Sequence, residues 1–157
     1  MIYLRQTGDY VVKLQISYPT ETLLTTTMHA YSEPIPFPGY LKAVWCVEET
    51  PGTNGTESLD LQYSSTGLVS GLASLVSTGT LFSFASGSGV PTYNTANLNT
   101  NPPVFAKGGI LALTVSTVHT TTAGADAFCM AVLARERGVI APAVQTATYS
   151  QDLDAIS

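Results

Sequence analysis

Charged residues are scarce in this chain of 157 residues. They make up 11% of the sequence, whereas an average soluble domain carries about 25%. Between Leu61 and Ala125 the only charged residue is Lys107, and serine, threonine, asparagine and glycine supply the polarity instead. A free monomer usually stays soluble through mixed surface charge. The long neutral stretch therefore favours a surface that partner subunits or an assembly cover.

Basic clusters and long apolar runs are also missing. The net charge is −5, and the six lysines and arginines are scattered. Binding to nucleic acid or to an anionic membrane surface depends on clustered Lys and Arg, so we expect neither partner. No apolar stretch reaches the roughly 20 residues of a membrane helix. The start of the chain, 1–6, lacks a basic region followed by an apolar run, which predicts synthesis in the cytoplasm without a signal peptide.

The chain has two cysteines, and each lies inside an apolar strand pattern. They are Cys46 and Cys129. A free cysteine behaves as a small buried hydrophobic residue, and disulfides are rare in the cytoplasm. We therefore expect two reduced core cysteines, with a disulfide or a reactive thiol as the alternatives.

No metal-binding signature is present, because there is no Cys-x-x-Cys and no paired histidine spacing. We expect no metal and no cofactor. Four carboxylates lie near one another in the sequence and would suit Ca²⁺, but their spacing is not that of an EF-hand loop. We expect them to belong to a solvated loop: Glu48, Glu49, Glu57 and Asp60.

No convincing catalytic signature is present either, so we expect a protein that is not an enzyme. Ser116, His119 and Asp126 lie near one predicted hairpin tip, which leaves a Ser-His-Asp hydrolase site as a remote alternative. That alternative would require an activity that is lost in His119→Ala.

Apolar strands dominate the rest of the sequence. The segment from Gly108 to Arg135 contains two apolar runs that flank the polar stretch 119–125, and we interpret it as a β-hairpin with a long loop. Both runs are apolar on both faces, so neither face can be fully solvated. One face should meet a second sheet, and the other should meet another copy of the chain or a different protein.

Period-two alternation predicts further strands along the chain. The segment Tyr40 to Glu48 has two distinct faces, with Leu41, Ala43, Trp45 and Val47 on one and Tyr40, Val44 and Cys46 on the other. The proline-rich segment 32–39 suits a rigid crossover between two sheets. The predicted strands are 10–17, 22–31, 40–48, 58–64 and 80–85, and the predicted irregular segments are 66–77, which has room for a single helical turn, and 86–103.

This pattern gives about eight strands and no convincing helix. It predicts an all-β protein, an antiparallel β-sandwich with a jelly-roll-like arrangement. We place the sandwich domain at 10–135, between an N-terminal arm at 1–9 and a C-terminal arm at 136–157.

In length and composition the chain resembles jelly-roll virion proteins of tailed bacteriophages. The residues that carry the resemblance are the apolar strand 40–47 after the proline-rich segment, the strand 108–115 and the final strand 127–134. Capsid decoration (cement) proteins of this kind form homotrimers at local threefold positions and clamp neighbouring major capsid subunits. The resemblance therefore implies a non-enzymatic role on the capsid surface of a virion, with synthesis in the host cytoplasm.

The two arms suit binding to a lattice, because extended termini can add strands or peptide contacts to neighbours. The alternative is a fibre or receptor-binding module that binds cell-surface glycans through the 86–103 loop and nearby tyrosines. The candidate interaction residues are Tyr3, Tyr93, Asn97, Val139 and Ile140.

Overall fold

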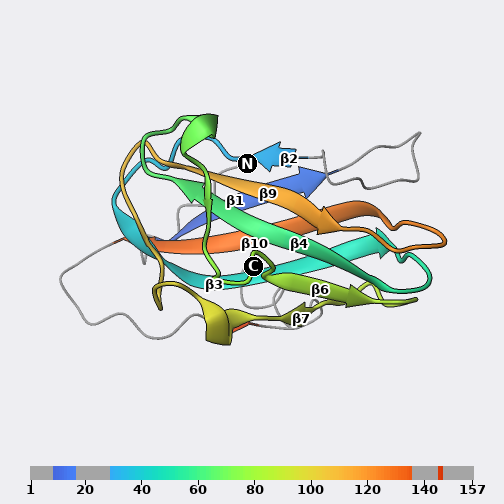
Figure 1. Cartoon of the computed structure of the whole chain (residues 1–157). Helices are drawn as coiled ribbons and strands as arrows, with labels where there is room; N and C mark the ends of the chain where they lie inside the picture. Colours follow the sequence, from blue (N-terminus) through green and yellow to red (C-terminus); the bar gives the residue numbers. More distant parts are fainter. Residues whose placement is uncertain (1–8, 17–28, 136–144, 147–157) are drawn as a thin grey trace.

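The protein is a sandwich of two β-sheets (Figure 1). The structure, a computed structural model, describes residues 9–16, 29–135 and 145–146. In the first sheet, β10 (Ala125–Arg135) lies between β1 (Tyr10–Ile16) and β3 (Gly39–Thr50), and two short strands, β8 (Val104–Phe105) and β11 (Gln145–Thr146), pair with β3. All these pairings are antiparallel except that of β11 with β3.

The second sheet is antiparallel throughout. Its order is β2 (His29–Tyr31), β9 (Ile110–Thr117), β4 (Thr56–Ser64), β6 (Phe82–Ala85) and β7 (Thr92–Tyr93), and β5 (Ala73–Ser74) pairs with β4. Two short 3-10 turns, η1 (Val69–Gly71) and η2 (Thr95–Asn97), interrupt the loops. Within the part of the chain that the structure describes, no helix is long and apolar enough to span a membrane.

The strand order is that of a jelly roll. Among the described residues, the strands β1-β10-β3-β8 oppose the strands β2-β9-β4-β6, which is the eight-stranded, two-sheet arrangement. The proline-rich segment leads from β2 in the second sheet to β3 in the first, as expected of a crossover. The predicted all-β sandwich is therefore confirmed, and β5, β7 and β11 are short additions to it. The predicted strand 22–31 is described only as β2, because 22–28 lie outside the described residues.

The core lies between the two sheets, where alternate side chains of facing strands meet. The first sheet contributes Val12, Leu14 and Ile16 of β1, which are at most 4% exposed. From the second sheet, the main contributors are Leu59, Leu61, Phe82, Phe84, Leu111, Leu113 and Val115.

The expected hairpin between the two long apolar runs is wrong. β9 pairs with β2 and β4 in the second sheet, whereas β10 pairs with β1 and β3 in the first. The polar segment 118–124 carries the chain from one sheet to the other. Each run is apolar on both faces because nearly all residues of each strand are buried, and period alone does not show which strands are neighbours.

The predicted faces of β3 are also wrong at Leu41, and the cause is a β-bulge. Leu41 pairs with Leu133 and Ala43 pairs with Val132, so Lys42 has no opposite residue on β10. One extra residue reverses the alternation. Leu41 therefore joins Val44 and Cys46 in the core instead of sharing a face with Trp45.

Several residues on the outer faces of the two sheets are buried within the single chain. Trp45 and Met130 point away from the core cluster, yet they are 1% and 6% exposed. On the second sheet, Ala112 and Thr114 are likewise buried. These four residues therefore need no partner to remove them from solvent, whereas Val47 and Phe128 on the outer face of the first sheet are half-buried.

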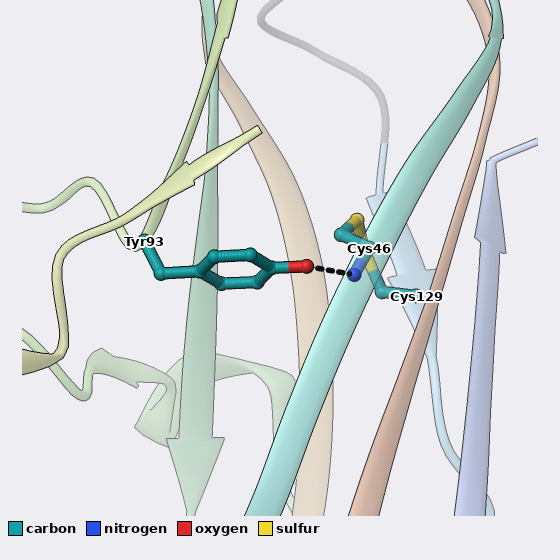
Figure 2. Close-up of a disulfide and its surroundings, with 3 residues drawn as sticks. All are labelled: Cys46, Tyr93 and Cys129. Atoms are coloured by element: carbon teal, nitrogen blue, oxygen red, sulfur yellow. Dashed lines mark hydrogen bonds between the residues drawn. A yellow bond between two sulfur atoms is a disulfide. The ribbon is translucent and has the colours of Figure 1, made fainter. Parts of the chain in front are cut away.

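The two cysteines are buried, as expected, but they form a disulfide (Figure 2). The expectation of reduced cysteines is therefore wrong. Cys46 and Cys129 are opposite each other on β3 and β10. The N–H of Cys46 donates to the Tyr93 hydroxyl and not to β10, which marks a non-hydrogen-bonded pair, the kind in which opposite side chains come closest. Only this register, which the sequence does not reveal, brings the two sulfurs together.

Candidate functional site

Three buried polar side chains meet at one end of the core: Glu48, Glu57 and His119. They are 2%, 0% and 3% exposed. A carboxylate oxygen of each glutamate and a ring nitrogen of the histidine all lie within 4.8 Å of one another. We call these three residues the acidic cluster.

Strand alternation places both carboxylates inside the sandwich. Glu48 follows the core residue Cys46 by two positions on β3, and Glu57 precedes the core residue Leu59 by two positions on β4. Residues two apart on a strand point to the same face. The two glutamates therefore extend the inner faces of opposing sheets.

The expectation of a solvated acidic loop is thus wrong for three of the four carboxylates. Glu48, Glu57 and Asp60 are buried, and only Glu49 is exposed. The structural reason is that Glu48 and Glu57 lie within strands β3 and β4, not in the loop between them. Asp60 lies on the opposite face of β4, where the Ser74 hydroxyl donates to it at 2.8 Å.

Two loops close over the cluster. The β3–β4 loop and the 118–124 segment are joined by backbone hydrogen bonds from Thr53 N to Thr122 O at 2.8 Å and from Thr120 N to Asn54 O at 2.9 Å. Two glycines make room for the polar side chains. A Cβ on Gly52 would overlap the His119 ring, and a Cβ on Gly124 would overlap the Glu48 carboxylate.

Few donors reach the polar atoms of the cluster. The His119 Nδ1 lies 3.2 Å from the Asn54 carbonyl oxygen. Because a carbonyl only accepts, Nδ1 carries the hydrogen and the Nε2 of a neutral ring keeps its lone pair. Glu57 Oε2 accepts from the Gly124 N–H at 3.1 Å. Four buried atoms have no hydrogen-bond partner among the described residues: both oxygens of Glu48, Oε1 of Glu57 and Nε2 of His119.

The environment opposes two negative charges in this site. Burial, and then the charge of Glu57, raises the pKa of Glu48 to about 8. The Gly52 amide lowers that pKa somewhat, although it makes no hydrogen bond of good geometry to either Glu48 oxygen. Burial likewise raises the pKa of Glu57, against the opposing effects of the Gly124 amide, of a side-chain interaction with Glu48 and of His119. The site therefore favours a bound proton or another cation over two free negative charges.

The remote Ser-His-Asp alternative gains no support from these contacts. Ser116 Oγ donates to the Gly79 carbonyl at 3.0 Å, whereas His119 faces Asn54 and the two glutamates. The side chains of Ser116 and His119 thus have different partners.

Two of the five predicted interaction residues, Tyr93 and Asn97, lie in the part of the chain that the structure describes, and their surroundings differ. Tyr93 is half-buried, with its ring packed edge-on against Phe82 at 5.6 Å and its hydroxyl bound to Cys46. Asn97 is exposed. Tyr3, Val139 and Ile140 lie outside the described residues, and so do the predicted arms apart from Asp9 and residues 145–146. Tyr93 therefore contributes to the fold, and Asn97 remains a candidate surface residue.

Sequence reasoning missed a second feature, a group of exposed apolar residues at the opposite end of the sandwich. Four of the five large hydrophobic residues that are exposed in the described chain lie near the start of β9, and we call them the apolar rim: Tyr31, Leu68, Val69 and Val104, which are 47–61% exposed. The fifth is Val90 at 48%.

Several contacts place the apolar rim at this end. Tyr31 pairs with Ala112 near the start of β9. The Cα of Gly67, beside Leu68, lies against the Gly108 carbonyl, and Val104 is four residues before Gly108. Figure 1 shows η1 above the end of the sandwich where β4 stops and β9 begins. Val90 lies elsewhere, because its neighbour Gly89 contacts Glu48 near the acidic cluster.

Comparison with known proteins gives one similarity, in fold. No protein-family model and no curated protein matches the chain. A solved structure, the cyanophage Pam1 capsid asymmetric unit, contains a chain that matches with a TM-score of 0.49 and 16% sequence identity, over 82% of this chain and 86% of that chain. At this level of identity the likeness concerns the fold alone.

Proposed function

We propose that this chain is a non-enzymatic structural protein of a phage virion, which decorates the capsid and stabilises it by bridging major capsid subunits as a homotrimer. The apolar rim is the observation that carries the proposal. Single exposed hydrophobic residues are normal, but here they share one end of the sandwich, and Lys107 is the only charge between Leu61 and Ala125. Apolar residues grouped on a surface commonly mark a protein-binding site.

Stabilisation of the shell follows from linkage. A protein that binds across capsid subunits binds the assembled shell and not the separate subunits, so it shifts the equilibrium toward the assembled state. A trimer adds avidity, so each rim needs only a weak contact.

Co-sedimentation with capsids tests the proposed role of the rim. We expect the purified chain to sediment with capsids of the phage that encodes it, and we expect the triple variant Leu68→Ser, Val69→Ser, Val104→Ser to lose at least tenfold in affinity. Val90→Ser is the matched control, because it removes a similarly exposed apolar residue from the other end. Equal binding by the triple variant and the wild type would refute the role of the rim.

Light scattering on a size-exclusion column tests the trimer. We expect three times the chain mass of 16.5 kDa, and a monomer at all concentrations would refute this part of the proposal. No specific observation favours the glycan-binding alternative, because the ring and hydroxyl of Tyr93 are engaged inside the fold.

A further inference from the structure

We propose that Glu48, Glu57 and His119 form a binding site for one divalent transition-metal ion, and that Zn²⁺ fits the donor set best. This inference concerns the end of the sandwich opposite the apolar rim and is independent of the proposed role on a capsid. It also departs from the expectation, based on sequence spacing, that the chain binds no metal.

The unpartnered atoms carry the inference. Buried polar atoms in folded proteins almost always have hydrogen-bond partners, and an unsatisfied one costs about 1–3 kcal/mol. Here four such atoms, from three side chains that are at least 97% buried, share one site. All four are acceptors when the carboxylates are ionised and His119 is neutral. A cation is the partner that satisfies several acceptors at once.

The spacing of the ligand atoms suits a single ion. One atom from each of the three residues lies within 4.8 Å of the others. Zn²⁺ binds carboxylate oxygens at about 2.0–2.2 Å and histidine nitrogen at about 2.0–2.1 Å, so small side-chain adjustments bring all three atoms into contact with an ion between them.

Hydrogen bonds to His119 and Glu57 resemble those that usually orient the ligands of a metal site. A ligating histidine typically donates its other ring N–H to a carbonyl or carboxylate, and His119 Nδ1 faces the Asn54 carbonyl in this way. The Gly124 N–H holds the Oε2 of Glu57 and leaves Oε1 free. His119 Nε2 and Glu57 Oε1 are thus the atoms that remain free to bind an ion.

The donor set distinguishes between classes of metal ion. Ca²⁺ takes six to eight oxygen ligands, and Mg²⁺ usually retains several waters. An enclosed site with one imidazole nitrogen and two carboxylates suits neither of them well. Imidazole favours Zn²⁺, Cu²⁺, Fe²⁺ and Ni²⁺, and Zn²⁺ accepts three protein ligands with a fourth position for water. Two carboxylates and a divalent ion also leave the buried site electrically neutral.

An ion at this position would link both sheets and a loop. Glu48 belongs to β3 in the first sheet, Glu57 to β4 in the second, and His119 to the segment that connects β9 with β10. The unfolded chain does not hold these residues together, so binding would stabilise the folded state by linkage. The competing account is a proton shared between the two glutamates, which needs no metal.

Metal titration of the whole chain decides between these accounts. The protein is purified with a chelator, the chelator is removed, and Zn²⁺ is added while the melting temperature and the bound metal are measured. We expect one Zn²⁺ per chain and a melting temperature that rises with the logarithm of free Zn²⁺. We also expect Zn²⁺ to shift the ring nitrogen NMR signals of His119 and to leave those of His29, which is exposed, unchanged.

The variant Glu48→Gln provides the sharper test, because the metal site and the shared proton predict different responses to metal. It keeps the size of the side chain and replaces the carboxyl with a neutral amide, so we expect the metal-free protein to have a stability close to that of wild type while the Zn²⁺-induced rise is lost. Glu49→Gln, which changes the exposed neighbour, should keep the full rise. Wild-type protein that binds no stoichiometric Zn²⁺ would overturn the proposal, and so would a Glu48→Gln variant with an unchanged Zn²⁺ response. Neither result would bear on capsid binding.

Discussion

The hydroxyl of Tyr93 accepts a hydrogen bond from the backbone N–H of Cys46 at 3.1 Å (Figure 2). The bond joins β7 of the second sheet to β3 of the first. Among the described residues, β8 and β11 pair with β3 only at residues 39–40 and 43–44, so the bond lies beyond these pairings. A side chain of one sheet thus satisfies a backbone donor of the other.

Tyr93→Phe should destabilise the protein by about 1–3 kcal/mol, because it leaves the Cys46 N–H without its acceptor. The measurement is the urea midpoint of unfolding. Tyr31→Phe is a suitable control, since Tyr31 is 47% exposed and the loss of its hydroxyl should change the free energy of unfolding by less than about 0.5 kcal/mol. Equal effects of the two changes would show that the Tyr93 bond contributes nothing.

The disulfide should be detectable by thiol counting. Denatured protein that has not been reduced should contain no reactive thiol, and reduction should release two. The double variant Cys46→Ala, Cys129→Ala should lose about 2–4 kcal/mol of stability, because the bond closes a loop across 83 residues of sequence. Two free thiols in the unreduced, denatured protein would contradict the disulfide and restore the expectation of reduced cysteines.

Trp45 reports whether one chain covers the outer face of the first sheet by itself. It is the only tryptophan, and it is 1% exposed within the single chain, with its ring edge-on to Phe128 at 5.4 Å. Acrylamide should therefore quench its fluorescence weakly, and to the same extent at all protein concentrations. Quenching that increases on dilution would mean that a second copy, and not the chain itself, covers this face.

Ser74→Ala should destabilise the protein more at pH 7 than at pH 4. Burial raises the pKa of Asp60, and the hydroxyl of Ser74 and the amide of Gln62 oppose that rise. A raised pKa in the folded state means that the contribution of Asp60 to stability is complete below the unfolded pKa of about 3.9 and is lost as the pH increases through the folded pKa. Without the Ser74 hydroxyl the pKa of Asp60 in the folded state rises further. The loss of stability at pH 7 should therefore be larger in the variant than in the wild type.

The expected cost of Ser74→Ala at pH 7 is about 1.5–3 kcal/mol, the usual range for a hydrogen bond to a charged group. Part of the cost is independent of pH, because Ser74 Oγ also accepts from the Val76 N–H at 3.1 Å. Urea unfolding at both pH values measures the difference, and Ser77→Ala at an exposed position is the control. An identical loss at pH 4 and pH 7 would contradict the pKa assignment.

The sequence was sufficient to predict the class of fold and most of the strands. Period-two alternation identified β1, β3, β4 and β6, and prolines identified the crossover before β3. The sequence alone could not show which strands are neighbours or how they are paired in register. The hairpin prediction failed because 118–124 crosses between sheets, and the faces of β3 were misassigned because the bulge at Lys42 leaves no mark in the apolar pattern. The same lack of register concealed the disulfide.

A signal for the acidic cluster was present in the alternation. Glu48 continues the inner face of Val44 and Cys46, and Glu57 precedes the inner residues Leu59 and Leu61 by the same period. Extending each inner face by one more position would have placed two carboxylates inside the sandwich. His119 could not have been assigned to them, because its position depends on how the 118–124 segment folds over the β3–β4 loop. The apolar rim follows from tertiary packing alone.

Cryo-electron microscopy of capsids mixed with the purified chain tests the proposed function most directly. The account predicts density for three copies of the jelly roll around each local threefold position, with the ends that carry Leu68, Val69 and Val104 against the major capsid subunits. Capsids without added density under saturating conditions would contradict the proposed role. Density in which these residues face solvent would contradict the assigned binding surface.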